Sequence, residues 1–285
     1  EWHRRDKESE THVSVYAIQY DLQLFSNFTY AMDRPETGDQ IAQKDDRSIV
    51  GMKASQAWNH HLAGIEMRSE VGTQLRHDRI HLGLYDTQAR HILGTTRIDD
   101  VHQTLLGLYA QSHVQWTPWL RSVLGLRSDA ANFTVNSVTR AANSGASQAH
   151  LWSPKMAWVA GPWQATEFFF NAGKGFHSND ARGTTAKLDP RTGTSIDAVP
   201  GLVASRGWEL GVRSQAIANV QSTLTYWRLR FDSELVYLEV SQLLGETFYS
   251  NPFLLTADES ERTTMFHYKD NNLETYQSIS FRTWY

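Results

Sequence analysis

The stretch NAGKGFHSNDARG, residues 171–183, combines glycines with amide, acidic and basic side chains that could bind a ligand. Gly173, Lys174 and Gly175 suggest a phosphate-binding loop. That motif, however, needs a complete glycine fingerprint that leads into a helix N-terminus. The residues that follow, to about 205, are rich in Gly, Thr, Asp and Pro and have no helical period. The stretch therefore does not fit a nucleotide site.

Five side chains of this stretch are the candidates for contact with a ligand: Lys174, His177, Asn179, Asp180 and Arg182. One interpretation is structural: Asn and Asp cap a turn, and the glycines permit positive φ. The other is functional: these donors and acceptors hold a polar ligand, and His177 contacts a metal chelate. We favour the structural interpretation, because a mobile polar loop of this composition needs no ligand to explain it.

The twelve histidines raise the question of a metal site. His77 and His81 stand four apart, and His60 and His61 are adjacent. In a strand, residues four apart share a face but lie about 13 Å from each other, which is too far for both to bind one ion. The sequence therefore predicts no metal site and no cofactor.

Several carboxylates invite comparison with a hydrolase, which needs two of them at a controlled separation. Here they lie on successive predicted strands together with arginines, and no nucleophile elbow marks a catalytic triad. We therefore predict that the protein is not an enzyme and that these charged side chains hydrogen-bond across strands in the lumen of a barrel. The predicted lumen-facing residues are Glu209, Arg213, Arg228, Arg230, Asp232 and Glu234.

The composition limits the class of protein further. Of the 285 residues, 40% are hydrophobic and none is Cys, so neither disulfides nor thiolate metal chemistry is available. The formal net charge is -4, and no basic cluster is interleaved with aromatic residues, which argues against a nucleic-acid partner. No apolar run approaches the roughly 20 residues of a membrane-spanning helix, and the start, EWHRRDKESE, lacks the apolar core of a signal peptide.

Apolar and polar residues alternate with the period of two that is typical of a β-strand. In 104–116, Leu106 and Leu108 occupy one face and Tyr109 and Gln111 the other. The same alternation recurs in 14–30, 207–215 and 223–235. Nine strands are predicted, at 12–30, 46–58, 62–77, 102–116, 119–131, 148–160, 164–174, 205–216 and 219–235.

The connections between these strands alternate in length. Tight turns fall near 58–62, 116–120, 160–163 and 216–219, whereas long polar segments occupy about 31–45, 78–101, 132–147 and 174–205. A membrane barrel has short periplasmic turns at one end and longer extracellular loops at the other. We therefore predict an all-β, antiparallel up-and-down transmembrane β-barrel, present as a part of about nine to ten strands.

The alternative is a soluble, secreted all-β domain that binds a ligand or acts on carbohydrate. Its apolar face would form a core, which does not require strands of this length. Five aromatic residues near predicted strand ends favour the barrel, because they suit its interfacial girdles: Tyr30, Trp116, Trp119, Trp158 and Trp163. Dependence on detergent would separate the two alternatives.

Four segments resemble the TonB-dependent outer-membrane receptors, which import scarce nutrients such as ferric siderophores, haem or cobalamin. They are NAGKGFHSNDARG, RGWELGVRS (206–214), TLTYWRLRFDSELVY (223–237) and LYAQSHVQWTPWLRSVLGLRSD (108–129). In this order they are similar to consecutive parts of the family's C-terminal barrel domain. The resemblance implies a receptor in the outer membrane of a Gram-negative bacterium, whose outer loops bind the ligand.

The resemblance also implies partners: TonB with its inner-membrane energising complex, a small-molecule or metal-chelate ligand, and outer-membrane lipid. TonB would act through a plug and a TonB box, which are absent from this sequence, and barrels of this family have about 22 strands. We therefore expect residues 1–238 to form part of such a barrel. Residues 239–285 lose the alternation and are expected to form a divergent tail, with one short strand at its end.

Overall fold

The computed structural model describes residues 1–27, 29–233, 264–265, 268–269 and 275–284, and it describes side chains in the first two of these ranges. The strands are β1 Trp2–Arg5, β2 Ser9–Ser26, β3 Ile41–Leu62, β4 Ile65–Gln88, β5 His91–Thr117, β6 Leu120–Ser137, β7 Gly145–Trp163, β8 Thr166–Ser178, β9 Leu202–Ser214, β10 Gln221–Phe231, β11 Thr264–Met265, β12 Tyr268–Lys269 and β13 Thr275–Trp284. Two short 3-10 helices, η1 Ala141–Asn143 and η2 Ala181–Thr184, lie in the connections. All nine predicted strands are present, as β2 to β10.

The strands form one sheet in the order β1 to β10, then β13 and β11, with β12 also paired to β13. The pairings with a defined register are antiparallel. Within the described residues, no pairing joins β1 to the other end of this order. The predicted fold class, an all-β up-and-down sheet that forms part of a barrel, is confirmed.

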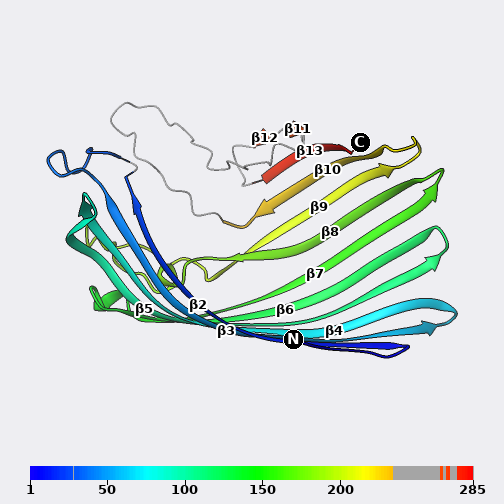
Figure 1. Cartoon of the computed structure of the whole chain (residues 1–285), viewed down its shortest axis with the longest axis horizontal. Helices are drawn as coiled ribbons and strands as arrows, with labels where there is room; N and C mark the ends of the chain where they lie inside the picture. The colour runs from blue at the N-terminus through cyan, green and yellow to red at the C-terminus, as the bar shows by residue number, and fades with distance from the viewer. Residues whose placement is uncertain (28, 234–263, 266–267, 270–274, 285) are drawn as a thin grey trace. The chain divides into compact units, whose positions relative to one another are not determined.

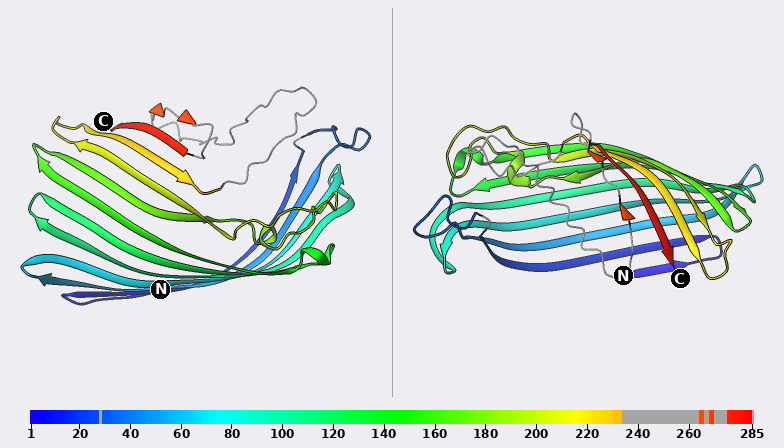
Figure 2. Two further views of the ribbon diagram at one scale, coloured as in Figure 1. Left: turned by 180° about the vertical axis from the view of Figure 1, so that it is seen from behind. Right: turned by 90° about the horizontal axis from the view of Figure 1, so that it is seen from above.

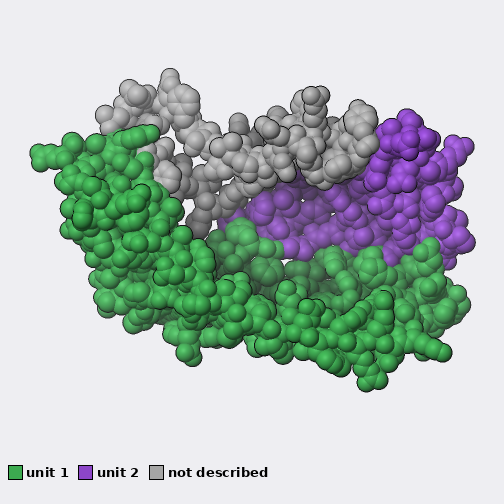
Figure 3. Space-filling view, viewed as in Figure 1, with its two compact units in different colours: residues 1–115, 123–155, 176–203 green, residues 116–122, 156–175, 204–285 purple. Residues whose placement is uncertain are grey.

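The chain divides into two compact units, coloured separately in Figure 3. Unit 1 contains residues 1–115, 123–155 and 176–203, and unit 2 contains residues 116–122, 156–175 and 204–285. The predicted boundary between 238 and 239 lies outside the described residues.

In unit 1, strands β2 to β5 run side by side (Figure 1), and the same arrangement is visible in Figure 2. The register is continuous from β2 to β3 to β4, and it pairs Ile18 with Ile49 and Ile49 with Asp78. Since partners across a ladder share a face, this register defines two faces. We call the face of Ile49 and Asp78 the inner face, and the opposite one the outer face.

The outer face of unit 1 carries exposed apolar side chains on four neighbouring strands: Val15, Val50, Val71, Leu75, Leu106 and Leu108. Such an exposed apolar row on long strands is what a barrel presents to lipid. Nearer to the N-terminal end of β3, the outer face carries polar side chains. Gln19 and Asp46 are two of them, and Gln19 donates to Asp46 at 2.7 Å. The inner face there carries Ile18 and Leu22. The apolar face predicted from 14–30 is thus the inner face, on which Ile18, Tyr20 and Leu24 are exposed.

A segment that follows β8 covers the inner face of β4 to β6. Ala181 and Leu202 are buried against Ile80, Val101 and other side chains of the inner face, and together they form the hydrophobic core of unit 1. The remaining buried members are Ala131, Phe133 and Val135 of β6.

Glycines on the inner face leave room for tyrosine rings. A Cβ at Gly72 would lie 2.5 Å from the Tyr109 ring, and one at Gly51 would lie 2.2 Å from the Tyr16 ring. The Tyr109 hydroxyl donates to Glu70 at 2.7 Å. Each tyrosine ring therefore lies directly over a glycine, because the absence of a Cβ there leaves room for the ring against the backbone.

Unit 2 also has two distinct faces. The β9–β10 register pairs Glu209 with Trp227, and Trp208 with Arg228. Trp208 and Leu210 are exposed, and the Trp208 ring lies 5.5 Å from that of Tyr226. We call these the Glu209 face and the Trp208 face; the latter carries exposed aromatic and aliphatic side chains together with Arg206, Arg228 and Arg230.

The tight turns occur close to the predicted positions, at 63–64, 118–119 and 164–165. The predicted loop at 78–101 is wrong, because β4 continues to Gln88 and β5 begins at His91. The turn between them consists of Ala89 and Arg90, both with positive φ. The polar residues that suggested a loop lie on both faces of a long hairpin: Arg79, His81 and Asp100 are on the outer face, and Asp78, Arg97 and Asp99 are on the inner face beside the apolar Ile80 and Leu82. None of the described residues forms a helix long and apolar enough to span a membrane.

Candidate ligand-binding site

Charged pairs two residues apart line the inner face of unit 1. Each of four consecutive strands carries one Arg and one Asp at this spacing: Asp45 and Arg47 in β3, Arg76 and Asp78 in β4, Arg97 and Asp99 in β5, and Arg127 and Asp129 in β6. Residues two apart in a strand point to the same side, so each arginine lies alongside its own carboxylate. The result is a band of paired charges across the sheet.

Asp78 is the most completely paired carboxylate of this band. It is fully buried and accepts from Arg76 Nε and Nη2, both at 2.7 Å, and from Gln103 Nε2 at 2.7 Å. Arg47 Nη1 lies 3.8 Å from the same carboxylate. A buried charge is tolerated only when it is paired and hydrogen-bonded in this way.

The segment after β8 brings a fifth pair to the inner face. Asp180 caps η2 by accepting from the Arg182 backbone N–H at 2.9 Å, and it also accepts from Arg182 Nη2 at 2.6 Å. Ala181, between them, is buried in the core. The burial of Ala181 thus holds its neighbours Asp180 and Arg182 close to the strands of the inner face.

Charged side chains of the band help to stabilise the ionised forms of Asp180 and Arg182. Partial desolvation raises the pKa of Asp180, but hydrogen bonds and charge from Arg182 outweigh this effect and hold that pKa below its ordinary value. Desolvation lowers the pKa of Arg182, but Asp180, together with Asp99 and Asp45, raises that pKa above its ordinary value. Both groups are therefore charged at neutral pH.

A buried asparagine fixes the course of the same loop. Asn143, at the end of η1, donates to the Leu188 carbonyl at 2.8 Å and accepts from the backbone N–H groups of Lys187 and Leu188, each at 2.9 Å. The Thr185 hydroxyl donates to the Asn143 carbonyl at 2.8 Å. The loop at 179–201 is therefore tied to the loop at 138–144 by hydrogen bonds that the buried side chains of Asn143 and Thr185 make with backbone groups.

The Asp86 carboxylate joins two loops to the end of β4. Asp86, near the tip of the β4–β5 hairpin, lies 3.4 Å from Arg34 Nη1 and 3.4 Å from Arg191 Nη2. Arg34 belongs to the loop at 27–40, which is organised by Asp39: this carboxylate accepts from the backbone N–H groups of Met32, Asp33 and Arg34. These connections thus form one continuous polar layer at this end of unit 1.

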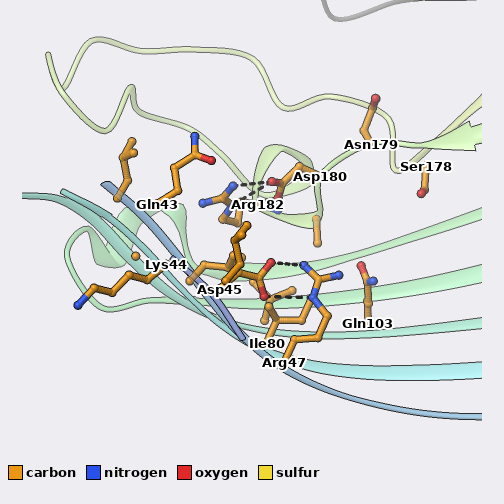
Figure 4. A pocket seen from close by; sticks show the side chains of 16 residues that line it. Gln43, Lys44, Asp45, Arg47, Ile80, Gln103, Ser178, Asn179, Asp180 and Arg182 are labelled. Atoms are coloured by element: carbon orange, nitrogen blue, oxygen red, sulfur yellow. Dashed lines mark hydrogen bonds and ion pairs between the residues drawn. The ribbon is translucent and has the colours of Figure 1, made fainter. Parts of the chain in front are cut away.

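A cavity of about 380 Å³ lies between the 178–182 segment and the inner face of β3 to β5. Figure 4 shows the Asp180–Arg182 pair on one wall and the Asp45–Arg47 pair on the other. Gln43, Gln103, Ser178 and Asn179 add further hydrogen-bonding groups to the lining. No lining residue is aromatic. Its volume lies within the range of about 300–1,000 Å³ that small-molecule sites occupy.

The structure brings three of the five predicted ligand residues to this cavity: Asn179, Asp180 and Arg182. Lys174 and His177 lie in β8 and are not part of its lining. The predicted structural role is also present, because Asp180 caps a turn and Asn179 donates to the Pro200 carbonyl at 2.8 Å. In the described residues, no group of three or more His, Asp or Glu side chains is arranged to hold a metal ion.

The residues predicted to share the lumen lie on two different faces of unit 2. Glu209 accepts from Asn171 at 2.6 Å, and Arg213 donates to Glu167 at 2.6 Å, a carboxylate that also accepts from Arg121 at 2.7 Å. The prediction that Arg228 and Arg230 share this face is wrong, because the register pairs them with Trp208 and Arg206. Asp232, just beyond β10, accepts from Arg206 at 3.1 Å instead. Glu234 lies outside the described residues.

Sequence reasoning missed the band of arginine and aspartate pairs. Its signal was present as the spacing Arg-x-Asp at 76–78, 97–99 and 127–129, and Asp-x-Arg at 45–47 and 180–182. A period of two places both members on one face, but only the register shows that the faces of successive strands coincide.

The comparisons with solved structures establish what this architecture resembles. The ferric citrate transporter FecA in its unliganded form matches with a TM-score of 0.62 and 11% identity, over 80% of this chain and 33% of that chain. The copper transporter OprC matches with a TM-score of 0.57 and 14% identity, over 79% and 36% of the two chains. The ferric yersiniabactin uptake receptor FyuA from Yersinia pestis matches with a TM-score of 0.54 and 12% identity, over 80% and 34%. At these identities the likeness shows the fold alone.

The chain spans about a third of the length of these structures. No curated protein matches the sequence. The family profile described as "TonB dependent receptor-like, beta-barrel", however, matches residues 3–263, which is most of the chain. This family consists of receptors and transporters, not enzymes, and its members reside in the outer membrane of Gram-negative bacteria. With its open antiparallel sheet, its exposed apolar face and its charged inner face, the chain belongs to the TonB-dependent receptor β-barrel family.

Proposed function

We propose that this chain supplies barrel wall and extracellular loops to an outer-membrane receptor that takes up a scarce nutrient, such as a ferric siderophore, with energy from TonB. The observation that carries the proposal is the cavity between the 178–182 segment and the charged inner face. Its walls come from residues 178–182 and from the four strands β2 to β5, so a ligand there would contact both loop and barrel. That is the arrangement that a receptor mouth needs.

The matched structures support a metal-containing ligand. Their names refer to transport or uptake of ferric citrate, ferric yersiniabactin and copper. Because the chain spans about a third of their length, the activity of the whole protein is inferred from the family and not from these residues alone.

The proposed partners are TonB with its inner-membrane complex, acting through a plug, and the lipid of the outer membrane. The lipid would contact the exposed outer face of unit 1 and the Trp208 face of unit 2. In unit 2, the Glu167, Arg121 and Arg213 cluster on the opposite side suits contact with a polar plug surface. We assign ligand contact to Asn179, Asp180 and Arg182, which line the cavity.

Uptake by whole cells tests this proposal. Cells that carry the protein are expected to accumulate an iron chelate in a TonB-dependent manner. Replacement of residues 184–196 by a flexible Gly-Ser segment of equal length should abolish uptake while the protein still reaches the outer membrane. Uptake that persists in cells without TonB, or after this replacement, would contradict the proposal.

A further inference from the structure

The cavity is charge-balanced, and this balance bears on which ligand it takes. Arg47 and Arg182 are its guanidinium groups, and Asp45 and Asp180 are its carboxylates. The ammonium of Lys44 is directed elsewhere, since its Nζ lies 5.4 Å from the centre of the Tyr85 ring. Figure 4 likewise shows the Lys44 side chain extending away from the two ion pairs. The two positive and two negative groups leave no excess of either sign.

The surroundings of the cavity preserve the same balance. Behind the lining, Arg76 with Asp78 and Arg97 with Asp99 form two more ion pairs on the inner face. Arg182 feels the charge of both Asp99 and Asp45, and Asp180 feels that of Arg97. A polyanionic ligand would meet these carboxylates at close range without an unpaired cation to compensate.

The lining also disfavours ligands that are recognised through aromatic rings. Aromatic chelating groups gain affinity by stacking on aromatic side chains, and none of the lining residues is Phe, Tyr or Trp. The lining offers donors and acceptors side by side, from two arginines, two aspartates and the amides of Gln43, Gln103 and Asn179. Such a surface suits a ligand that presents carbonyl oxygens and N–H or O–H groups but has no net charge.

We infer that the cavity between the 178–182 segment and the Asp45–Arg47 pair selects a net-neutral, non-aromatic metal chelate of the hydroxamate class. Three hydroxamates, each with one negative charge, neutralise one ferric ion, and the chelate exposes amide and carbonyl groups. Arginine N–H groups not used on the aspartates donate to these oxygens, while the aspartates and side-chain amides accept from the ligand's N–H groups. This inference rests on the proposed function, because it names the ligand class of the same site.

Binding measured on isolated outer membranes that contain the protein tests the inference. The probes are ferrioxamine E, a neutral ferric trihydroxamate, then ferric citrate, which is anionic, and a ferric tris-catecholate, which is anionic and aromatic. The neutral chelate is expected to bind at least about tenfold more tightly than either anionic one. Membranes without the protein serve as the blank.

Two substitutions change the balance in opposite directions. Asp180→Asn leaves the cavity with a positive excess and should raise the affinity for ferric citrate relative to ferrioxamine E by about tenfold, whereas Arg182→Gln should lower it. Arg191→Gln is the matched control, because it removes the same charge from the same loop but outside the cavity lining, and it should leave the ratio unchanged.

The outcomes separate the two proposals. Tighter binding of an anionic chelate by the unmodified protein, or an affinity ratio that neither cavity variant moves, overturns the neutral ligand class but leaves the receptor proposal standing. If none of the three chelates binds above the blank, both the ligand class and the proposed function fail.

Discussion

Glu209 and Trp227 are direct partners across the β9–β10 ladder, so their side chains point to the same side of the sheet. The adjacent pair, Trp208 and Arg228, points to the other side, where Leu210 and Tyr226 are exposed. Tyr226, an aromatic residue, therefore lies on the face that we propose contacts lipid, and the larger Trp227 lies on the charged face. The identity of a side chain alone does not reveal its face here.

Single cysteines test this assignment in a chain that has none of its own. Trp227→Cys should react with a small water-soluble thiol reagent in intact outer membranes, because it faces the polar side. Tyr226→Cys should be protected by lipid and react only after solubilisation in detergent. Equal reactivity of the two in membranes, or the reverse order, would show that the register of β10 is misplaced.

Asp78 should be important for stability. Asp78→Ala removes the fully buried acceptor of Arg76 and Gln103, at a cost of about 1–3 kcal/mol, because the Arg76 side chain is 43% exposed and can still reach water. The temperature at which the barrel loses its compact migration in SDS gels should fall clearly. Asp21→Ala, which removes an exposed carboxylate, is the control and should leave that temperature unchanged. A similar effect of both variants would argue against a special role of Asp78.

Asn143 should hold the loop at 179–201 in place. Asn143→Ala removes one donor and one acceptor that together bind three backbone groups of Lys187 and Leu188, a loss of about 1–3 kcal/mol for a buried polar group left unsatisfied. Hydrogen exchange of residues 185–190 should accelerate while that of the strands does not change. Asn136→Ala, at an exposed position of β6, should have no effect. Unchanged exchange in the Asn143 variant would mean that other contacts suffice.

Acid should weaken the docking of the η2 segment. The pKa of Asp180 is depressed in the folded state, so its contribution is fully present above the ordinary carboxyl pKa of about 3.9 and is lost as the pH falls below that value. Exchange of residues 180–184, corrected for the intrinsic pH dependence, should therefore increase below about pH 4. In Asp180→Asn the segment should exchange faster at neutral pH, and the acid-induced change should be smaller. Docking that is insensitive to pH in the unmodified protein would assign its stability to Ala181 alone.

The tryptophans beside two tight turns should lie at the membrane interface. Trp119 and Trp163 are exposed, and their rings lie 5.8 Å apart, next to the turns at 118–119 and 164–165. Replacement of both by Phe should reduce quenching by lipids brominated near the headgroup, because amphipathic rings prefer that level. Trp208→Phe, in the middle of β9, should instead reduce quenching by lipids brominated near the bilayer centre. The opposite pattern would contradict the proposed depth of the strands.

The sequence by itself determined the class of fold. Alternation with a period of two marked four segments, 14–30, 104–116, 207–215 and 223–235, and the predicted tight turns placed further strand ends, although the predicted loop at 78–101 proved to be a two-residue turn. These signals are local, since turn chemistry and alternation depend on neighbours in the chain. Asn179, Asp180 and Arg182, which line the cavity, were among the candidates for the same reason, because they cluster within four positions of the sequence.

Only the tertiary structure decided which face is which and where the charges meet. The aliphatic residues Ile80 and Val101 could face lipid or a core, and their burial together with Ala181 and Leu202 makes the inner face of β4 and β5 a core. Likewise, Arg228 could share a face with either neighbour until the pairing with Trp208 is known. A one-residue slip exchanges the two faces of a strand, and register is set by pairing between residues distant in sequence. Composition and periodicity carry no record of that pairing, which is why the charged band and the cavity became visible only in the folded sheet.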